Sequence, residues 1–170
     1  WSNRYGDQMI GVALLGATGS IGASTLAVLR QHRDRFRLVA VAVRSNWEAL
    51  LPIIAEFGPQ VCAIEDEQAA LSLSAAMSRH HPQVEVVAGR DAASIAATGA
   101  GAQVVVAGIS GFAGLPSTWA AVAAGKQVLL ANKEALVASG NLLLNMARQS
   151  GANVLPIDSE HNAAYQCANG

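Results

Sequence analysis

Short apolar runs alternate along the chain with longer stretches of helical periodicity. The runs have the length of strands and lack polar alternation, which is typical of strands covered on both faces. They are Ile10–Leu15, Leu38–Val43, Val61–Ile64, Val84–Val87, Val104–Ala107, Val128–Leu130 and Val154–Leu155. Apolar residues at three- and four-residue spacing predict helices over Ile21–Gln31, Trp47–Phe57, Glu67–His80, Ala92–Ala97, Pro116–Ala124 and Glu134–Gln149. This alternation predicts an α/β fold with a doubly wound, mostly parallel sheet.

Glycine and proline positions refine these boundaries. Glycines stand where predicted helices or strands end, at Gly58, Gly89, Gly125 and Gly151. Pro116 fits the first turn of its helix, because that turn needs no N–H from the ring nitrogen. Pro52 lies well inside the predicted helix over 47–57, so we expect it to kink or split that helix.

Composition narrows the class of protein. Hydrophobic residues make up 52% of the 170 residues and charged residues 14%, which excludes intrinsic disorder. The net charge of -1 and the absence of a basic run argue against a nucleic-acid partner. The uncharged stretch over 92–125 is interrupted by glycine, serine and proline, so we expect no membrane span. Two cysteines, Cys62 and Cys167, suit a reducing compartment, and we expect a soluble cytoplasmic protein.

A glycine-rich segment, Gly16-Ala17-Thr18-Gly19-Ser20-Ile21-Gly22, follows the first strand and opens a helix. In a phosphate-binding loop of this type, Gly16 would allow the tight turn and Gly19 the approach of a pyrophosphate. Gly22 would let the helix pack closely on the sheet. The unpaired N–H groups of the helix start would face the anion. The segment therefore predicts a Rossmann-like dinucleotide-binding domain, and the alternative is a purely structural turn.

The end of the second strand bears on the choice of dinucleotide. Domains specific for NAD usually have Asp or Glu there to bind the ribose 2′-hydroxyl. This chain has Arg44-Ser45-Asn46 instead, and a guanidinium matches the geometry of a 2′-phosphate. We therefore expect NADPH as cofactor. In the alternative, Arg44 is solvated and Asn46 caps the next helix.

Polar residues follow three later strands. Asn132-Lys133-Glu134 could bind cofactor amides and a substrate anion, or could simply start a helix. Asp158 and Glu160, two residues apart on an extended segment, could bind Mg²⁺ or Mn²⁺, or could cap a helix. The segment over 108–114, which follows the fifth strand, fits either a wall of the nicotinamide site or a plain turn.

Taken together, the chain resembles the N-terminal part of the 1-deoxy-D-xylulose 5-phosphate reductoisomerase family. The resemblance rests on three segments in order: Gly16 to Gly22, Leu130-Ala131-Asn132-Lys133-Glu134-Ala135-Leu136, and Leu155-Pro156-Ile157-Asp158-Ser159-Glu160-His161-Asn162-Ala163. It extends over nearly the whole chain from Ile10 onwards. The family rearranges 1-deoxy-D-xylulose 5-phosphate and reduces the product with NADPH to 2-C-methyl-D-erythritol 4-phosphate, on the non-mevalonate route to isoprenoids.

The resemblance implies roles for individual residues. Residues Gly16, Thr18, Gly19, Ser20, Ile21, Asn46, Asn132 and Glu134 would contact NADPH. Lys133 would bind substrate and polarise its oxygens, and Ser159 and Glu160 would touch the same sugar phosphate. Asp158 and Glu160 would bind Mg²⁺ or Mn²⁺, so Lys133 and Glu160 are the expected catalytic residues.

One segment departs from the family. Many members have Gly-Lys-Asn where this chain has Arg44-Ser45-Asn46, so only Asn46 carries over directly. Arg44 supplies an equivalent charge, and we expect Arg44 and Ser45 to contact the cofactor as well.

The resemblance also predicts the domain organisation. We expect a tail over 1–8, an NADPH-binding domain over 9–157, and the start of a truncated catalytic domain over 158–170. Such a chain should bind NADPH with little or no turnover, and the full-length protein should be a homodimer. One rival is a non-catalytic NADP-binding module. A semialdehyde dehydrogenase would need a cysteine nucleophile after a strand, and Cys62 and Cys167 are poorly placed for that role.

Overall fold

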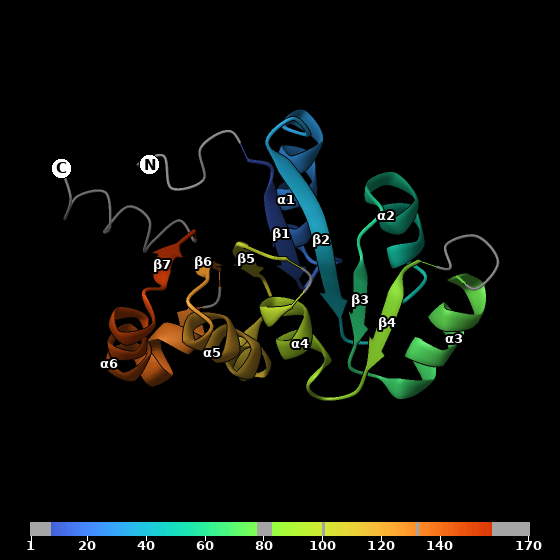
Figure 1. The fold of residues 1–170 in the computed structure, drawn as a ribbon. Coiled ribbons are helices and arrows are strands. Elements are labelled where there is room, and N and C mark those ends of the chain that lie inside the picture. Colours follow the sequence, from blue (N-terminus) through green and yellow to red (C-terminus); the bar gives the residue numbers. More distant parts are fainter. Residues whose placement is uncertain (1–7, 78–82, 100, 132, 158–170) are drawn as a thin grey trace.

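The protein folds around one seven-stranded sheet (Figure 1). The computed structural model describes residues 8–77, 83–99, 101–131 and 133–157. The strands are β1 (Ile10–Leu15), β2 (Phe36–Val43), β3 (Val61–Ile64), β4 (Glu85–Ala88), β5 (Val104–Ala107), β6 (Gln127–Leu130) and β7 (Asn153–Pro156). The helices are α1 (Ser20–Gln31), α2 (Leu50–Phe57), α3 (Glu67–Met77), α4 (Ala92–Thr98), α5 (Leu115–Ala123) and α6 (Lys133–Ser150), with a 3₁₀ turn η1 (Gly111–Gly114).

The order of the strands shows that the sheet is doubly wound. The order is β4-β3-β2-β1-β5-β6-β7, and each of the six pairings among the described residues is parallel. The first four strands build outwards from β1, and β5 then returns to the other side of β1. The predicted doubly wound α/β fold is therefore confirmed, and the order reverses between β1 and β5.

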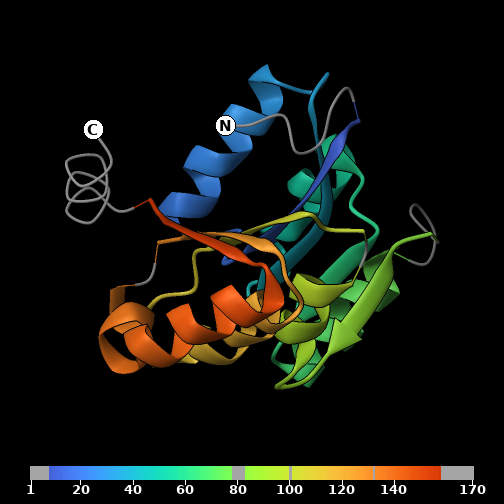
Figure 2. The same ribbon diagram turned by 60° about the vertical axis from the view of Figure 1, so that its left-hand side comes forward.

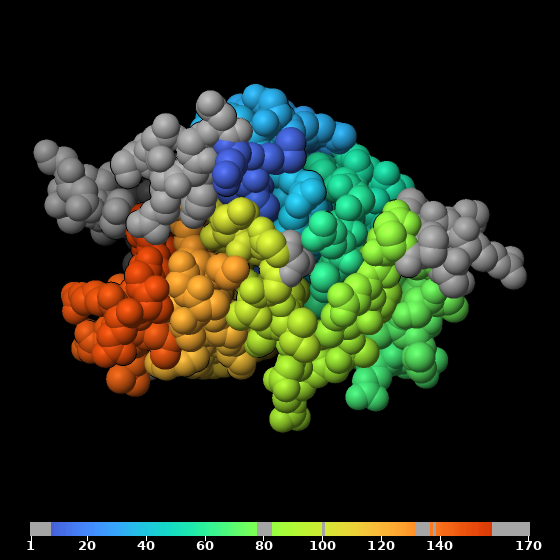
Figure 3. Space-filling model, viewed as in Figure 1, coloured from blue at the N-terminus to red at the C-terminus, as the bar shows by residue number. Residues whose placement is uncertain are grey.

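Two layers of helices cover the sheet, each over its own apolar core. Helices α1, α2 and α3 bury residues such as Leu26, Ile54 and Leu73 on one face. Helices α4, α5 and α6 bury smaller residues, including Ala96 and Ala121, on the other. Figure 2 shows α1 on one side of the sheet and α6 on the other. In the space-filling view, the described residues from α4 to β7 form one continuous block of yellow-green to red atoms (Figure 3).

A β-bulge in β2 changes which side chains face each core. Val12 pairs with Leu38, but its neighbour Ala13 pairs with Ala40, so Val39 is an extra residue in the longer strand. Val39 and Ala40 consequently both belong to the core under α4, whereas Leu38 belongs to the core under α1. The uninterrupted apolar run of this strand carries no sign of the bulge.

The element boundaries match the predicted ones within two residues where the chain is described, except at α2. This helix begins at Leu50, three residues later than expected, so Pro52 lies in its first turn. The expected kink at Pro52 is wrong, because first-turn residues have no intrahelical acceptor for an N–H group. Residues 46–49 form a turn instead, in which Asn46 Oδ1 accepts a hydrogen bond from Ala49 N at 3.3 Å.

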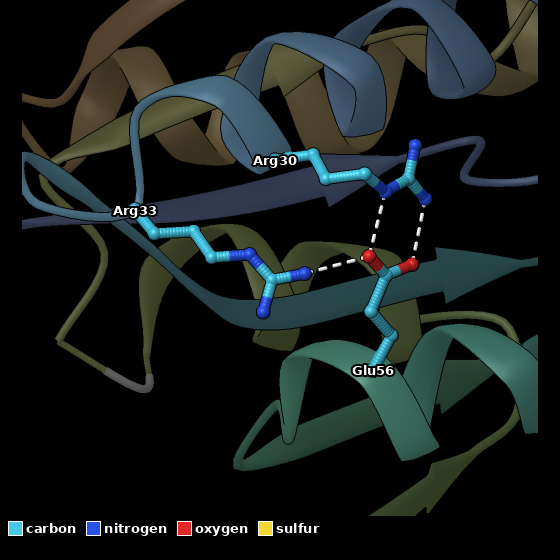
Figure 4. A network of polar contacts seen from close by, with 3 residues as sticks. All are labelled: Arg30, Arg33 and Glu56. Carbon is cyan, nitrogen blue, oxygen red and sulfur yellow. Dashed lines mark hydrogen bonds and ion pairs between the residues drawn. The ribbon is translucent and has the colours of Figure 1, made fainter.

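An ion-pair network joins the end of α1 to α2 (Figure 4). Arg30 Nε and Nη2 donate to the two carboxylate oxygens of Glu56 at 2.6 Å each, and Arg33 Nη2 donates to Oε1 at 2.6 Å. Both guanidinium groups also lie over the ring of Phe57. The hydrogen bond from Arg30 lowers the pKa of Glu56. The side chains of Arg30, Arg33 and Glu56 are 50%, 53% and 32% exposed. Because water screens such charges, the network contributes little to the free energy of unfolding.

Candidate functional site

The candidate site lies at the carboxyl ends of the central strands, where the strand order reverses. Ligands of open α/β sheets bind at such a reversal point. Along this edge the strands follow the order β2, β1, β5, β6 and β7. Neighbouring strands lie about 4.8 Å apart, so the edge extends about 19 Å from β2 to β7. The carboxyl ends of these five strands therefore lie along one edge of the sheet, although they are far apart in the sequence: Leu15, Val43, Ala107, Leu130 and Pro156.

The glycine-rich loop is anchored to the sheet by its first two residues. Gly16 N and Ala17 N both donate to the carbonyl oxygen of Ala42 in β2, at 2.8 and 3.1 Å. Gly16 has a φ of +81°, a conformation that strains residues with a side chain. A Cβ at Gly16 would also lie 2.6 Å from the carbonyl oxygen of Gly108. The tight turn that the sequence predicts at Gly16 is therefore present.

The other two glycines of the loop differ in their surroundings. A Cβ at Gly22 would collide with the carbonyl oxygen of Ala17 and lie 2.7 Å from that of Gly16. Gly22 thus permits close packing of α1, but against the loop itself rather than against the sheet as predicted. A Cβ at Gly19 would meet only Gly16 O, at an ordinary 3.5 Å. The fold accordingly leaves open the space above Gly19, which is exposed.

The start of α1 presents unpaired hydrogen-bond donors. Among the described residues, the backbone N–H groups of Thr18, Ser20 and Ile21 have no hydrogen-bond acceptor. The capping residue, Gly19, makes no side-chain cap, and no acidic residue lies in the first turn. The helix dipole adds partial positive charge at the same point. Together with the open space above Gly19, these donors fit a pyrophosphate group.

The segment over 44–46 leaves β2 beside the glycine-rich loop. Arg44, Ser45 and Asn46 are exposed, and Arg44 O accepts a hydrogen bond from Asp66 N at 2.9 Å. Within the described part of the chain, the guanidinium of Arg44 forms no ion pair. It is therefore available to an anion from solution. The Asn46 side chain accepts a hydrogen bond from Ala49 N in the turn before α2, but it does not cap the helix as in the alternative interpretation, because the N-cap is Ala49.

The remaining predicted site residues fall outside what the structure describes in full. Asn132, Asp158, Ser159 and Glu160 lie outside the described residues, and for Lys133 and Glu134 only the backbone, at the start of α6, is described. Ala131 N bonds to Ala107 O, and Ile157 N bonds to Leu130 O. The pairing of β5, β6 and β7 thus continues up to the point where both segments begin.

The metal site stays a prediction. Among the residues that the structure describes, no group of three or more His, Cys, Asp or Glu side chains could hold a metal ion. Asp158 and Glu160 supply carboxylate oxygens, which are ligands suited to Mg²⁺ or Mn²⁺.

Two further residues bear on the chemistry of the site. Gly108 contacts the glycine-rich loop, a contact that the sequence did not predict, because it left the segment over 108–114 open between a wall of the nicotinamide site and a plain turn. Cys62, in the middle of β3, is fully buried, and burial raises the pKa of its thiol to about 12. A fully buried thiol with a raised pKa is a poor nucleophile at neutral pH, which argues against Cys62 as a catalytic residue. In the described part of the chain, no helix is long and apolar enough to cross a membrane.

Comparisons with known proteins agree with this geometry. The sequence matches the family described as 1-deoxy-D-xylulose 5-phosphate reductoisomerase over residues 12–140. A curated relative of that name from a Cyanothece species is 44% identical over 162 residues, 95% of this chain and 42% of the relative.

Solved structures give the same result. A structure of DOX-P reductoisomerase in complex with NADPH, fosmidomycin and magnesium has a TM-score of 0.89 and 43% identity, covering 94% of this chain and 39% of that one. The Zymomonas mobilis reductoisomerase in complex with NADPH has a TM-score of 0.87 and 41% identity, covering 94% and 41%. This chain thus spans about two fifths of the length of these relatives.

Proposed function

Because the chain belongs to the 1-deoxy-D-xylulose 5-phosphate reductoisomerase family, we propose that it forms the NADPH-binding part of such an enzyme. The enzyme would convert 1-deoxy-D-xylulose 5-phosphate to 2-C-methyl-D-erythritol 4-phosphate, by rearrangement and then hydride reduction, in isoprenoid biosynthesis. The observation that carries this proposal is the set of unpaired N–H groups at the start of α1, where the strand order reverses.

The described residues would bind the adenosine half of the cofactor. The N–H groups of Thr18, Ser20 and Ile21 would donate to the pyrophosphate, with Gly19 leaving room for it. Arg44 and Ser45, one strand away, would bind the 2′-phosphate through the guanidinium and the hydroxyl. The strand order would then direct the rest of NADPH from β1 towards β5 and β6.

The segments that follow β6 and β7 would bind the reacting groups. Asn132 and Glu134 would contact the cofactor, and Lys133 would bind the substrate anion. Asp158 and Glu160 would hold Mg²⁺ or Mn²⁺, with Ser159 and Glu160 also touching the substrate. When bound, NADPH supplies the hydride and the cation polarises the substrate oxygens.

A fluorescence titration of the 170-residue chain with NADPH and with NADH tests the cofactor assignment. We expect NADPH to bind at least about a hundredfold more tightly than NADH, because a 2′-phosphate gains a charge-assisted bidentate contact. Arg44→Ala should reduce that preference about tenfold, with NADH binding unchanged.

Arg37 provides the matched control, because it is exposed at the opposite end of the same strand. Arg37→Ala should leave both affinities as they are. If the wild-type chain bound neither dinucleotide, the proposed function would be wrong. An unchanged preference in Arg44→Ala would remove only the role of Arg44.

We further propose that the 170-residue chain binds NADPH but turns over little or no substrate. It spans about two fifths of the length of its relatives, and two carboxylates leave most of the coordination shell of a divalent cation to water. The oxidation of NADPH in the presence of 1-deoxy-D-xylulose 5-phosphate and Mn²⁺ or Mg²⁺ measures this directly. Steady conversion by the isolated chain would contradict the proposal.

Finally, we propose that the full-length protein is a homodimer, as the family resemblance implies, and that it is cytoplasmic, because the two cysteines of this chain suit a reducing compartment. Sedimentation of the full-length gene product would measure its oligomeric state, and a monomer at micromolar concentration would refute the dimer. Cell fractionation would test the compartment.

A further inference from the structure

Gly108 lies in close contact with both ends of the glycine-rich loop. Its backbone N donates to Leu15 O at 2.9 Å, which extends the pairing of β5 with β1. A Cβ on Gly108 would lie 2.9 Å from Leu15 O and 3.3 Å from Ile21 Cγ2. In return, a Cβ on Gly16 would lie 2.6 Å from Gly108 O. Three segments thus meet at this point: the end of β1, the end of β5 and the first turn of α1.

Position 108 requires a glycine because of this close approach, and not because its backbone has a conformation that only glycine adopts. Seven described glycines have a positive φ, and Gly108 is not among them. An alanine could therefore adopt the same backbone conformation without strain. The added methyl group would need about half an ångström more room at Leu15 O, and about a tenth of an ångström at Ile21 Cγ2.

The two neighbours of Gly108 differ in their freedom to move. Leu15 is fully buried in the central strand of the sheet, with strands paired on both sides. Ile21 is only partly buried and belongs to the first turn of α1. Because Leu15 O cannot retreat, the methyl group at position 108 would have to move away from β1, and its other close neighbour, Ile21 in the first turn of α1, would give way. That turn carries the unpaired N–H groups of Ser20 and Ile21.

We propose that Gly108 is a positioning residue: its missing side chain sets the distance between β5 and the start of α1, and so aims the N–H groups at the cofactor pyrophosphate. This inference rests on the proposed function. It assigns Gly108 no contact with the cofactor itself.

The test compares Gly108→Ala with the wild-type chain for two ligands, NADPH and 2′-phospho-ADP-ribose, which shares the pyrophosphate but lacks nicotinamide. Both dissociation constants should rise at least about tenfold and by the same factor, because the displaced donors face the shared pyrophosphate. Gly140→Ala is the matched control, since a Cβ there meets no atom within 4 Å. That variant should bind both ligands like the wild-type chain.

A double-mutant cycle with Ile21→Ala separates positioning from a general loss of structure. In Gly108→Ala/Ile21→Ala the truncated side chain gives way to the new methyl group. The affinity lost through Gly108→Ala should therefore be smaller in the double variant than in the wild-type background. Two independent, additive losses would overturn the proposal.

Other outcomes are equally decisive. If Gly108→Ala lost affinity for NADPH alone, Gly108 would lie against nicotinamide. If the Gly108→Ala chain were unfolded, or were less stable with unchanged affinity for both ligands, Gly108 would serve folding only. Either result overturns the proposal. Wild-type affinity in Gly108→Ala would overturn the inference alone, whereas a wild-type chain that binds neither ligand would overturn the proposed function as well.

Discussion

Replacing Gly19 with alanine should weaken NADPH binding about a hundredfold, equivalent to ~2.7 kcal/mol, without lowering the stability of the fold. The backbone of Gly19, with φ -85° and ψ 178°, is one that alanine adopts readily. The new Cβ would meet only Gly16 O, at 3.5 Å, which is an ordinary contact. The methyl group would instead occupy the space that a pyrophosphate needs in order to reach the N–H groups of α1.

Two measurements on the same variant test this expectation. Titration with NADPH gives the affinity, and urea unfolding gives the free energy of unfolding. Gly140→Ala again serves as control, because it adds the same methyl group in α6, at a position where a Cβ meets no atom within 4 Å. Unchanged NADPH affinity in Gly19→Ala would favour the alternative in which the loop is a structural turn.

Replacing Gly22 with alanine should have the opposite profile and destabilise the fold by about 3 kcal/mol. The added Cβ would collide with Ala17 O and would lie 2.7 Å from Gly16 O, and both are backbone atoms. Gly16 and Ala17 are themselves hydrogen-bonded to Ala42 in β2, so the loop cannot retreat without losing those bonds. The gain in helix propensity from alanine, about 1 kcal/mol, is too small to compensate.

Urea unfolding of Gly22→Ala measures this loss directly. The substitution is expected to lower the free energy of unfolding. Because NADPH binds the folded chain, NADPH at saturating concentration should raise the unfolding midpoint of any variant that still folds. A Gly22→Ala chain as stable as the wild type would show that α1 can shift outwards at little cost. The close packing that we assign to Gly22 would then be wrong.

These two glycines show how far a spacing pattern predicts a site. The spacing of Gly16, Gly19 and Gly22 after a strand selects the loop correctly, because the turn and the helix start are local structures. The spacing does not predict which atoms each glycine approaches, because those contacts depend on how the chain folds. The spacing predicts an open Gly19 and a closely packed Gly22, but only the folded chain shows that Gly22 packs against the loop and not against the sheet.

Two further features of the fold were not predicted, because the local patterns there were ambiguous. An apolar strand covered on both faces has no polar alternation, so the bulge at Val39 left no trace in the sequence. The apolar residues before Pro52 continued the helical pattern backwards, although Asn46 closes a turn there. A short polar side chain that bonds to the backbone competes with helix formation, and its geometry decides the outcome.

The sequence by itself determined the kinds of elements, their order and the loop that joins the first strand to the first helix. These depend on residue type and on spacing within one or two turns of chain. Only the tertiary structure decided that β5 lies beside β1 and that Gly108 reaches Gly16. The partners of a parallel pairing are brought together by burial of two helical layers, and that long-range packing has no local signature in the chain.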